Sequence, residues 1–132
     1  MIVLTKRPDD KHTRIIQKVR LLVDGQIVSF VNVHFSNNQY SDEQLEETLQ
    51  YIRASGEASV ILGDFNIFDI TAVKHLYEKS YVASTEIADY ISFPSEAATF
   101  DYVLVPKQYQ LSSLETHEGL SDHNALTCKL AI

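Results

Sequence analysis

The order of hydrophobic and polar positions along the chain predicts a layered domain of strands and helices. Residues 14–23 and 26–35 are rich in β-branched side chains and flank Asp24-Gly25, a dipeptide that favours the positive φ angles of a tight turn. We therefore expect these two segments to form a β-hairpin. Three further short apolar runs have the character of strands and cover residues 58–62, 100–105 and 125–132.

Two segments have the pattern of helices. Ser41-Asp-Glu-Gln44 matches a capping box, and apolar residues follow it at helical spacing as far as Ile52. This pattern predicts a helix over residues 41–54 with its apolar stripe against a sheet. A second, shorter helix is expected to begin near Asp69, whose side chain can accept hydrogen bonds from the first turn.

The run 58–62 is continuously apolar, which is typical of a strand covered on both faces, and Gly63 is expected to end it. Asp64 and Asn66 would then lie just past the carboxyl end of that strand. The predicted order is β-β-α-β-α-β-β, and neither a repeat nor a linker divides the sequence. We therefore expect residues 1–132 to form a single α/β or α+β layered domain.

Composition narrows the function classes. A content of 45% apolar and 22% charged residues in 132 is ordinary for one soluble domain, and the net charge of −7 works against broad binding to duplex DNA. Cys128 is the only cysteine, so it excludes an intrachain disulfide. No apolar run approaches the ~20 residues of a membrane span, and the opening segment does not resemble a secretory signal. These features predict a cytoplasmic protein.

Polar side chains recur at the ends of the predicted strands, where a sheet can hold them toward one shared site. Taken singly, each has an ordinary explanation, such as a hydrogen-bonded structural histidine, an Asx turn or a polar loop. Their occurrence together favours a site, because imidazoles exchange protons near neutral pH and carboxylates position water or hold a hard cation. The residues are His34, Asp64, Asn66, Asp101, Asp122 and His123.

The segments VNVHF, VILGDFN, TFDYVLV and GLSDHNAL occur in this order, and together they resemble the endonuclease/exonuclease/phosphatase superfamily. Its members include exonuclease III-type and deoxyribonuclease I-like enzymes, inositol-phosphate phosphatases and sphingomyelinases. The resemblance covers residues 27–132. It implies a four-layer α-β-β-α sandwich, a divalent metal that is usually Mg²⁺ but also Mn²⁺, and attack of an activated water on a phosphoester.

The resemblance also implies a role for each residue. Asp64 orients or activates the attacking water, and Asn66 hydrogen-bonds the phosphate oxygens beside it. His123 contacts the scissile phosphate or exchanges a proton, while Asp101 orients its imidazole. His34 binds the phosphate from the other side. Asp122 holds or positions the metal.

The chain departs from the family in one respect. Similar proteins carry a preceding half-domain with an Asn and a metal-binding Glu, whereas MIVLTKRP resembles a mid-domain strand. We therefore expect the C-terminal half of the sandwich, with a mixed sheet and helices on one face. Asp9 and Asp10 are expected in a polar loop and do not replace the Glu, so metal affinity is expected to be low. The uncovered sheet predicts a homodimer or pairing with an N-terminal half.

Two function classes stay open from the sequence. The first is a metal-dependent phosphodiesterase or phosphatase that is present as an incomplete catalytic domain. The second is a non-catalytic binding or assembly module that retains the motif residues. The substrate of the first is a small phosphoester, a lipid headgroup or a nucleic acid, and the acidic residues within 80–99 slightly disfavour DNA.

Overall fold

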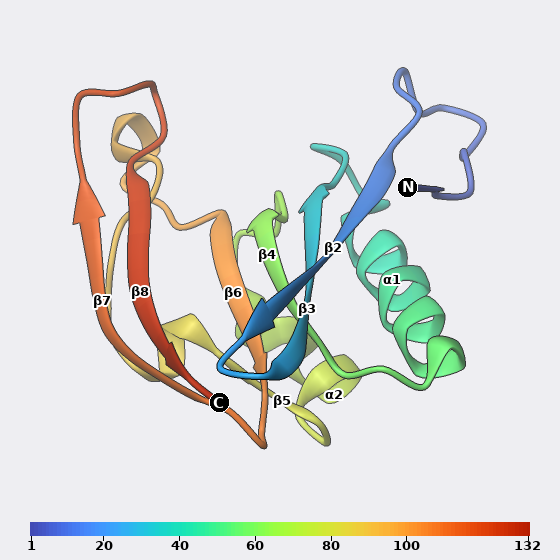
Figure 1. The fold of residues 1–132 in the computed structure, drawn as a ribbon. Helices are drawn as coiled ribbons and strands as arrows, with labels where there is room; N and C mark the ends of the chain where they lie inside the picture. The colour runs from blue at the N-terminus through green and yellow to red at the C-terminus, as the bar shows by residue number, and fades with distance from the viewer.

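The computed structural model describes the whole chain, residues 1–132, and its strands form a six-stranded sheet and a separate hairpin (Figure 1). The large sheet has the strand order β1-β2-β3-β4-β6-β5, and β7 pairs with β8. The strands are β1 (Ile2–Val3), β2 (Ile15–Val23), β3 (Gln26–His34), β4 (Ser59–Asp64), β5 (Tyr81–Ala83), β6 (Asp101–Pro106), β7 (Gln110–His117) and β8 (Ala125–Ala131). The helical segments are α1 (Ser41–Ser55), η1 (Ile70–Val73), α2 (Lys74–Tyr77), η2 (Ser84–Glu86) and η3 (Pro94–Glu96).

The predicted hairpin is confirmed. Val23 pairs with Gln26, and Asp24 and Gly25 make the turn with φ angles of 48° and 80°. The chain then crosses over through α1, so that β4 runs parallel to β3, whereas every other neighbouring pair in the sheet is antiparallel. The sheet is therefore mixed, as predicted.

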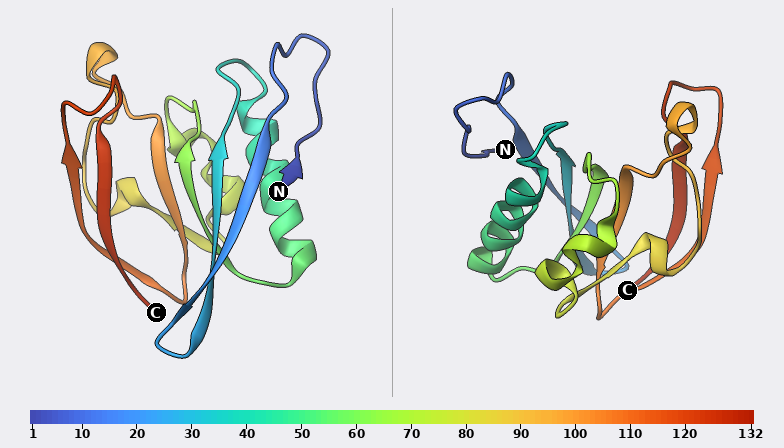
Figure 2. Two further views of the ribbon diagram at one scale, coloured as in Figure 1. Left: turned by 45° about the horizontal axis from the view of Figure 1, so that its top comes forward. Right: turned by 180° about the vertical axis from the view of Figure 1, so that it is seen from behind.

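Helices α1 and α2 both cover the same face of the large sheet, as the view from behind shows (Figure 2). The main core of 18 buried residues lies between these helices and the strands. Leu45 and Leu49 of α1 are 0% and 2% exposed, and each such burial contributes about 1.5–3 kcal/mol before entropy is subtracted. The apolar stripe of α1 therefore anchors the crossover, and its contact with the sheet confirms the prediction.

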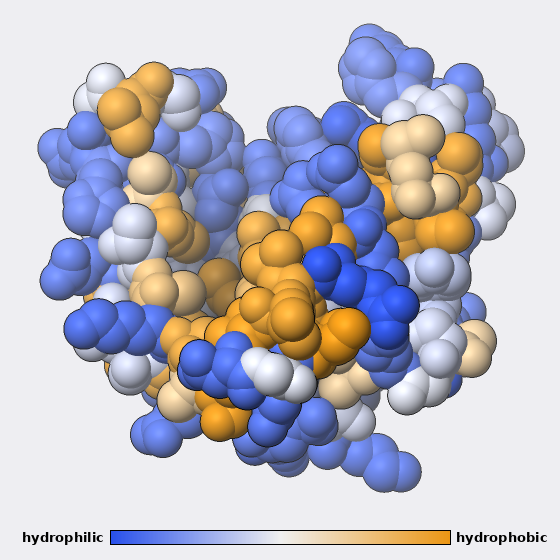
Figure 3. All heavy atoms as spheres, viewed as in Figure 1, coloured by the Kyte–Doolittle hydropathy of each residue, from blue (hydrophilic) through white to orange (hydrophobic).

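The β7–β8 hairpin stands against the other face of the sheet (Figure 1). A second, smaller core joins the two sheets there through Val60, Val103, Val105 and Leu111. Above this contact the sheets diverge and leave an apolar groove, which is visible in Figure 3 as a band of hydrophobic atoms between two more polar flanks.

Several details of the predicted elements are wrong. Strand β4 continues through Gly63 to Asp64, and β5 and β7 are strands that the sequence pattern did not reveal. The opening segment contains a strand, β1, as its resemblance to a mid-domain strand implied. The capping box is absent, since Tyr40 is the N-cap of α1 and makes no side-chain cap. The side chain of Gln44 turns inward and accepts a hydrogen bond from the Ser36 amide at 2.7 Å. Buried amides need partners, and here the partners lie outside the helix.

The N-terminal segment around Asp9 and Asp10 forms a loop, as predicted, but one of the two carboxylates is buried. Asp10 is 6% exposed and accepts hydrogen bonds from the Ser36 hydroxyl at 2.6 Å and from the Gln44 amide at 3.2 Å. This carboxylate therefore ties the loop to the end of β3 and to α1. The longest helix, α1, has 15 residues, and none of the helices combines the length and apolarity of a membrane span.

Candidate active site

The strand register brings three of the predicted site residues into one row. His34 ends β3 and pairs with Asp64 at the end of β4, and Asp64 in turn pairs with Asp101 at the start of β6. Directly opposed residues of neighbouring strands point to the same face. As a result, the Nε2 atom of His34 lies 3.5 Å from the Oδ2 atom of Asp64.

A glycine permits this register. Gly63 has a φ of 135°, and a Cβ atom built there would lie 2.0 Å from the carbonyl oxygen of Val33 on the neighbouring strand. Only a residue without a side chain allows the two backbones to approach so closely. Gly63 therefore carries β4 one residue further, so that Asp64 reaches the row.

Asn66 shapes the loop that follows. It has a φ of 50°, in the left-handed region, and its backbone N–H donates to the Oδ1 atom of Asp64 at 2.9 Å, which closes an Asx turn. Its side-chain amide donates to the carbonyl oxygen of Phe35 at 2.7 Å. One carboxylate oxygen of Asp64 is thus held by the loop, while the other faces the two imidazoles.

His123 reaches the same place from the loop before β8. Its Nδ1 atom lies 2.7 Å from the Oδ2 atom of Asp101, and its Nε2 atom lies 3.7 Å from the Oδ2 atom of Asp64. The next residue, Asn124, is 8% exposed and anchors the loop by donating its backbone N–H to Ser92 at 2.7 Å and its side-chain amide to Ile91 at 3.0 Å. The imidazole is therefore oriented by a carboxylate and by a fixed backbone.

Two pKa values respond to this arrangement. Burial raises the pKa of Asp64, and the charge of Asp101 adds to the increase, although the hydrogen bond from the Asn66 amide opposes it. Burial lowers the pKa of His123, but the hydrogen bond and charge of Asp101, together with the charges of Asp64 and Asp122, outweigh burial and raise it. The site therefore favours a protonated His123 beside a carboxylate that is more basic than an ordinary aspartate.

The same residues form a group that is able to hold a metal ion. Asp64, Asp101 and His123 each offer one ligand atom, and these atoms lie within 4.8 Å of one another. The two carboxylates suit a hard divalent cation, whereas the Nδ1 atom of His123 is already engaged by Asp101. Asp122 is exposed and does not belong to this group.

The structure thus gathers His34, Asp64, Asp101 and His123, with Asn66 in the adjoining turn. It also reveals two supporting residues that the sequence did not single out. The Ser92 hydroxyl accepts hydrogen bonds from the backbone N–H groups of Phe100 and Asp101, at 2.9 and 3.1 Å. The ring of Phe93 packs 4.9 Å from that of His123. No local pattern in the 80–99 segment could have indicated these contacts.

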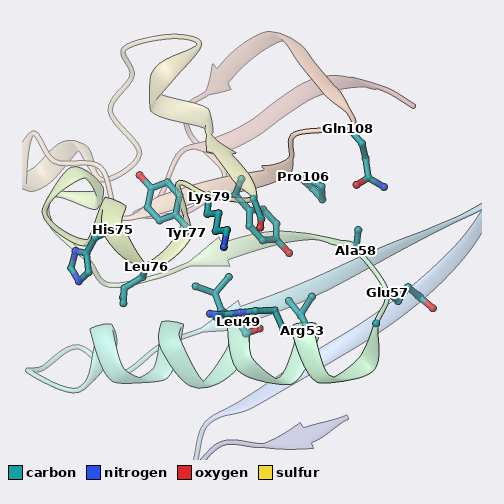
Figure 4. Close-up of a pocket in the computed structure, with 14 residues that line it drawn as sticks. Leu49, Arg53, Glu57, Ala58, His75, Leu76, Tyr77, Lys79, Pro106 and Gln108 are labelled. Carbon is teal, nitrogen blue, oxygen red and sulfur yellow. Dashed lines mark hydrogen bonds between the residues drawn. The ribbon is translucent and has the colours of Figure 1, made fainter.

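Another cavity lies away from these residues. Its volume is about 480 Å³, and it opens between α1 and the α2–β5 segment, over Leu49, Arg53, Tyr77 and Tyr81 (Figure 4). Ala58, just before the start of β4, also lines it, whereas Asp64 is at the other end of that strand. None of the predicted site residues lines this cavity, so it is separate from the candidate active site.

The sequence matches no family model and no curated protein. Solved structures, in contrast, match nearly the whole chain. A functionally unknown conserved protein from Enterococcus faecalis V583 superposes with a TM-score of 0.80 at 18% identity, over 96% of this chain and 60% of its own. An endonuclease/exonuclease/phosphatase protein from Bacteroides vulgatus gives 0.77 at 22% identity, over 99% and 63%. D. rerio TDP2 in complex with a single-strand DNA product gives 0.72 at 17%, over 99% and 68%.

The chain therefore has the fold of endonuclease/exonuclease/phosphatase proteins, as the sequence motifs predicted. It spans about three fifths of the length of the first two solved chains that it matches. This coverage fits the C-terminal half of such a domain, with a mixed sheet and helices on one face of it. The predicted fold class is confirmed.

Proposed function

We propose that the chain carries the acid–base residues of a metal-dependent phosphoester hydrolase, either a phosphodiesterase or a phosphatase, of the endonuclease/exonuclease/phosphatase superfamily. The observation that supports it most directly is the convergence of Asp64, Asp101 and His123 from three separate segments within 4.8 Å. The fold shared with proteins that include a mannosyl-6-phosphatase from Bacteroides thetaiotaomicron and D. rerio TDP2 bound to DNA is consistent with phosphoester chemistry.

In this proposal Asp64 orients the attacking water and accepts its proton, a task that its raised pKa assists. The water oxygen attacks phosphorus as the bond to the leaving oxygen breaks, and the electron pair stays on that oxygen. His123, protonated and held by Asp101, contacts the phosphoryl oxygens or returns a proton to the leaving group. Asn66 hydrogen-bonds the phosphate oxygens beside Asp64, and His34 binds the phosphate from the other side. Fixed charges and a positioned water lower the barrier without reorganisation.

The proposed cofactor is Mg²⁺ or Mn²⁺. Oxygen atoms of Asp64 and Asp101 would hold it, and Asp122 would position it from the exposed loop beside His123. What such a cation supplies when bound is neutralisation of the charge on the phosphoryl oxygens. Proteins usually hold Mg²⁺ with one or two carboxylates together with substrate phosphates, so the two converging carboxylates supply only part of the ligand set, and we propose a low affinity in the absence of substrate.

The test is hydrolysis of bis(p-nitrophenyl) phosphate in the presence of Mg²⁺ or Mn²⁺. We expect the wild type to release p-nitrophenol, and Asp64→Ala and His123→Ala to lose at least about 100-fold of the rate, the usual scale of a general acid or base. His75→Ala, in the exposed part of α2, serves as the matched histidine control and should keep the rate. Equal residual rates in all four proteins would exclude catalysis by this chain and leave a binding or assembly module.

We propose in addition that a second polypeptide packs on the groove between the two sheets, either another copy of this chain as a homodimer or a separate N-terminal half. The groove has a volume of about 360 Å³, and 10 of its 13 lining residues are hydrophobic. Apolar surface of this kind is seldom left uncovered. The lone, exposed Cys128 beside it fits a reducing compartment, and we propose the cytoplasm as the location.

A further inference from the structure

Four aromatic rings form a continuous series that ends at the candidate active site. The ring of Phe68 lies 6.3 Å from that of Phe100, and the ring of Phe100 lies 5.9 Å from that of Phe93. Phe93 then packs against His123 at 4.9 Å. All three separations between phenylalanine and its neighbour are within the range of direct ring contact. An apolar wall therefore extends from the imidazole of His123 outward.

Phe68, at the outer end of this series, is held in solvent. Phe68 is 73% exposed, whereas the other five phenylalanines are buried or half-buried. Single exposed apolar residues are common on protein surfaces. What distinguishes Phe68 is that its ring continues a series that reaches a candidate catalytic residue.

The backbone that carries Phe68 is fixed. The neighbouring Ile67 and Ile70 are 5% and 2% exposed, and the Tyr102 hydroxyl lies 2.7 Å from the carbonyl oxygen of Ile67 and 3.3 Å from that of Phe68. Asp69 accepts a hydrogen bond from the Thr71 amide at 3.0 Å and starts η1. Phe68 is therefore presented to solvent by an anchored turn, which lowers the entropy cost of binding a ligand against it.

We infer that the site takes a phosphoester that also carries a planar aromatic group, and that this group stacks on Phe68. The inference rests on the proposed function, because the phosphate must lie at His123 for the aromatic group to reach the wall. An exposed ring face binds another ring by offset stacking, whereas a sugar or a short aliphatic group gains much less from it.

The net charge of the chain restricts how long a negatively charged ligand can be. A net charge of −7 opposes a long polyanion, so the aromatic phosphoester is a monomer or a short end rather than an extended duplex. Two sources of the ring share this chemistry, a nucleobase on the sugar and an aryl group bound directly to the phosphate. The ring lies further from the phosphate in a nucleotide than in an aryl ester, so binding experiments with both kinds of ligand can distinguish the two sources.

Isothermal titration calorimetry with five ligands tests the inference. AMP and ribose 5-phosphate form the first pair, phenyl phosphate and glycerol 2-phosphate the second, and inorganic phosphate is the reference. We expect the aromatic member of at least one pair to bind about tenfold more tightly than its aliphatic partner, on the scale of one stacking contact. A preference in the first pair identifies a nucleobase, and a preference in the second identifies an aryl ester.

Phe68→Ala should abolish this preference, Phe68→Tyr should keep it, and neither should change the binding of inorganic phosphate. Val3→Ala, which truncates another exposed apolar residue at the sheet edge, is the control and should leave all affinities unchanged. Equal affinities within both pairs, or a preference that survives Phe68→Ala, would overturn the inference. If inorganic phosphate still binds in that case, the proposed site itself remains supported. Loss of phosphate binding itself would overturn both. Phe68-dependent binding to phosphatidylcholine vesicles, without an aromatic preference, would instead assign the wall to a membrane surface.

Discussion

At the scale of single residues, the proposed chemistry depends most on the imidazole of His123. Asp101 holds its Nδ1 atom at 2.7 Å, and the Nε2 atom is left facing Asp64. The first contact fixes which nitrogen points into the site. The surrounding carboxylates also raise the pKa of His123, although burial opposes them. Asp101 therefore both orients the His123 ring and contributes to its raised pKa.

Asp101→Asn is expected to lower the pKa of His123, because the charge and the charge-assisted hydrogen bond that favour the imidazolium are both lost. NMR titration of the His123 ring protons in the chain treated with a chelator measures this directly. Since the protonated form acts in the proposed reaction, activity should fall as the pH rises through the His123 pKa, and in Asp101→Asn this fall should occur at lower pH. An unchanged titration midpoint in the variant would contradict the assignment.

At the scale of elements, the site depends on how closely β3 and β4 approach one another. Strand β4 brings Asp64 beside His34 only because Gly63 passes under the Val33 carbonyl without a side chain. The position combines a φ of 135° with a contact of 2.0 Å for any added Cβ atom. Backbone geometry here is therefore a requirement of the site as well as of the fold.

Gly63→Ala should lower the free energy of unfolding by more than about 2 kcal/mol, because strain and backbone overlap occur together. Urea denaturation measures the loss. Gly25→Ala, in the hairpin turn, also has a positive φ but open space around it, so it should cost less. A variant at Gly63 as stable as the wild type would show that the two strands can separate without cost.

A second contact at this scale is made by Asp10, which joins the N-terminal loop to α1. The pKa of Asp10 is lowered, chiefly by the hydrogen bond from the Ser36 hydroxyl, with burial acting in the opposite direction. A carboxylate with a lowered pKa stabilises the fold above its ordinary pKa and loses that contribution as the pH falls through its folded value.

Asp10→Asn should therefore be less stable than the wild type near neutral pH, and the difference should shrink in acid. Chemical denaturation of both proteins at neutral and acidic pH measures it. Asp9→Asn is the matched control, since Asp9 is exposed and makes no hydrogen bond or ion pair through its side chain. A gap between wild type and Asp10→Asn that widens in acid would contradict the role given to Asp10.

At the scale of the whole molecule, the face of the large sheet opposite α1 and α2 is only partly covered. Val19 pairs with Phe30, and Phe30 pairs with Val60, so these three residues share the face that also lines the groove. Val19 and Leu21, two positions along on the same face, are 43% and 48% exposed. The hairpin β7–β8 covers the β4–β6 side of this face but leaves the β2 side open (Figure 3).

Light scattering should show association at micromolar concentration if another copy covers this face, as proposed. Replacing both Val19 and Leu21 with Lys places charge in the contact and should return the protein to the monomer mass, because an unpaired buried charge is costly. The exposed Leu22, on the opposite face of β2, provides the control substitution Leu22→Lys, which should not change the mass. A well-folded wild-type monomer would exclude the homodimer.

The sequence alone determined the local features of this protein. β-Branched residues predicted β2 and β3, Asp24-Gly25 predicted their turn, and helical spacing predicted α1, because these signals act over a few neighbouring residues. The order of the motifs around His34, Asp64, Asp101 and His123 was sufficient for the correct fold class. The capping box failed because Gln44 found hydrogen-bond partners in Ser36, just after β3, and Asp10, in the N-terminal loop, and no local pattern reveals such contacts.

Only the tertiary structure decided which side chains meet. The register of β3, β4 and β6 aligned His34, Asp64 and Asp101, and the anchored loop before β8 delivered His123 to them. The tertiary structure also brought Phe68, Phe93 and Phe100 together into an aromatic wall, which no single stretch of the sequence contains. The physical reason is that contacts between residues far apart along the chain are fixed by close packing and strand register, whereas a sequence pattern reports only the preferences of neighbours.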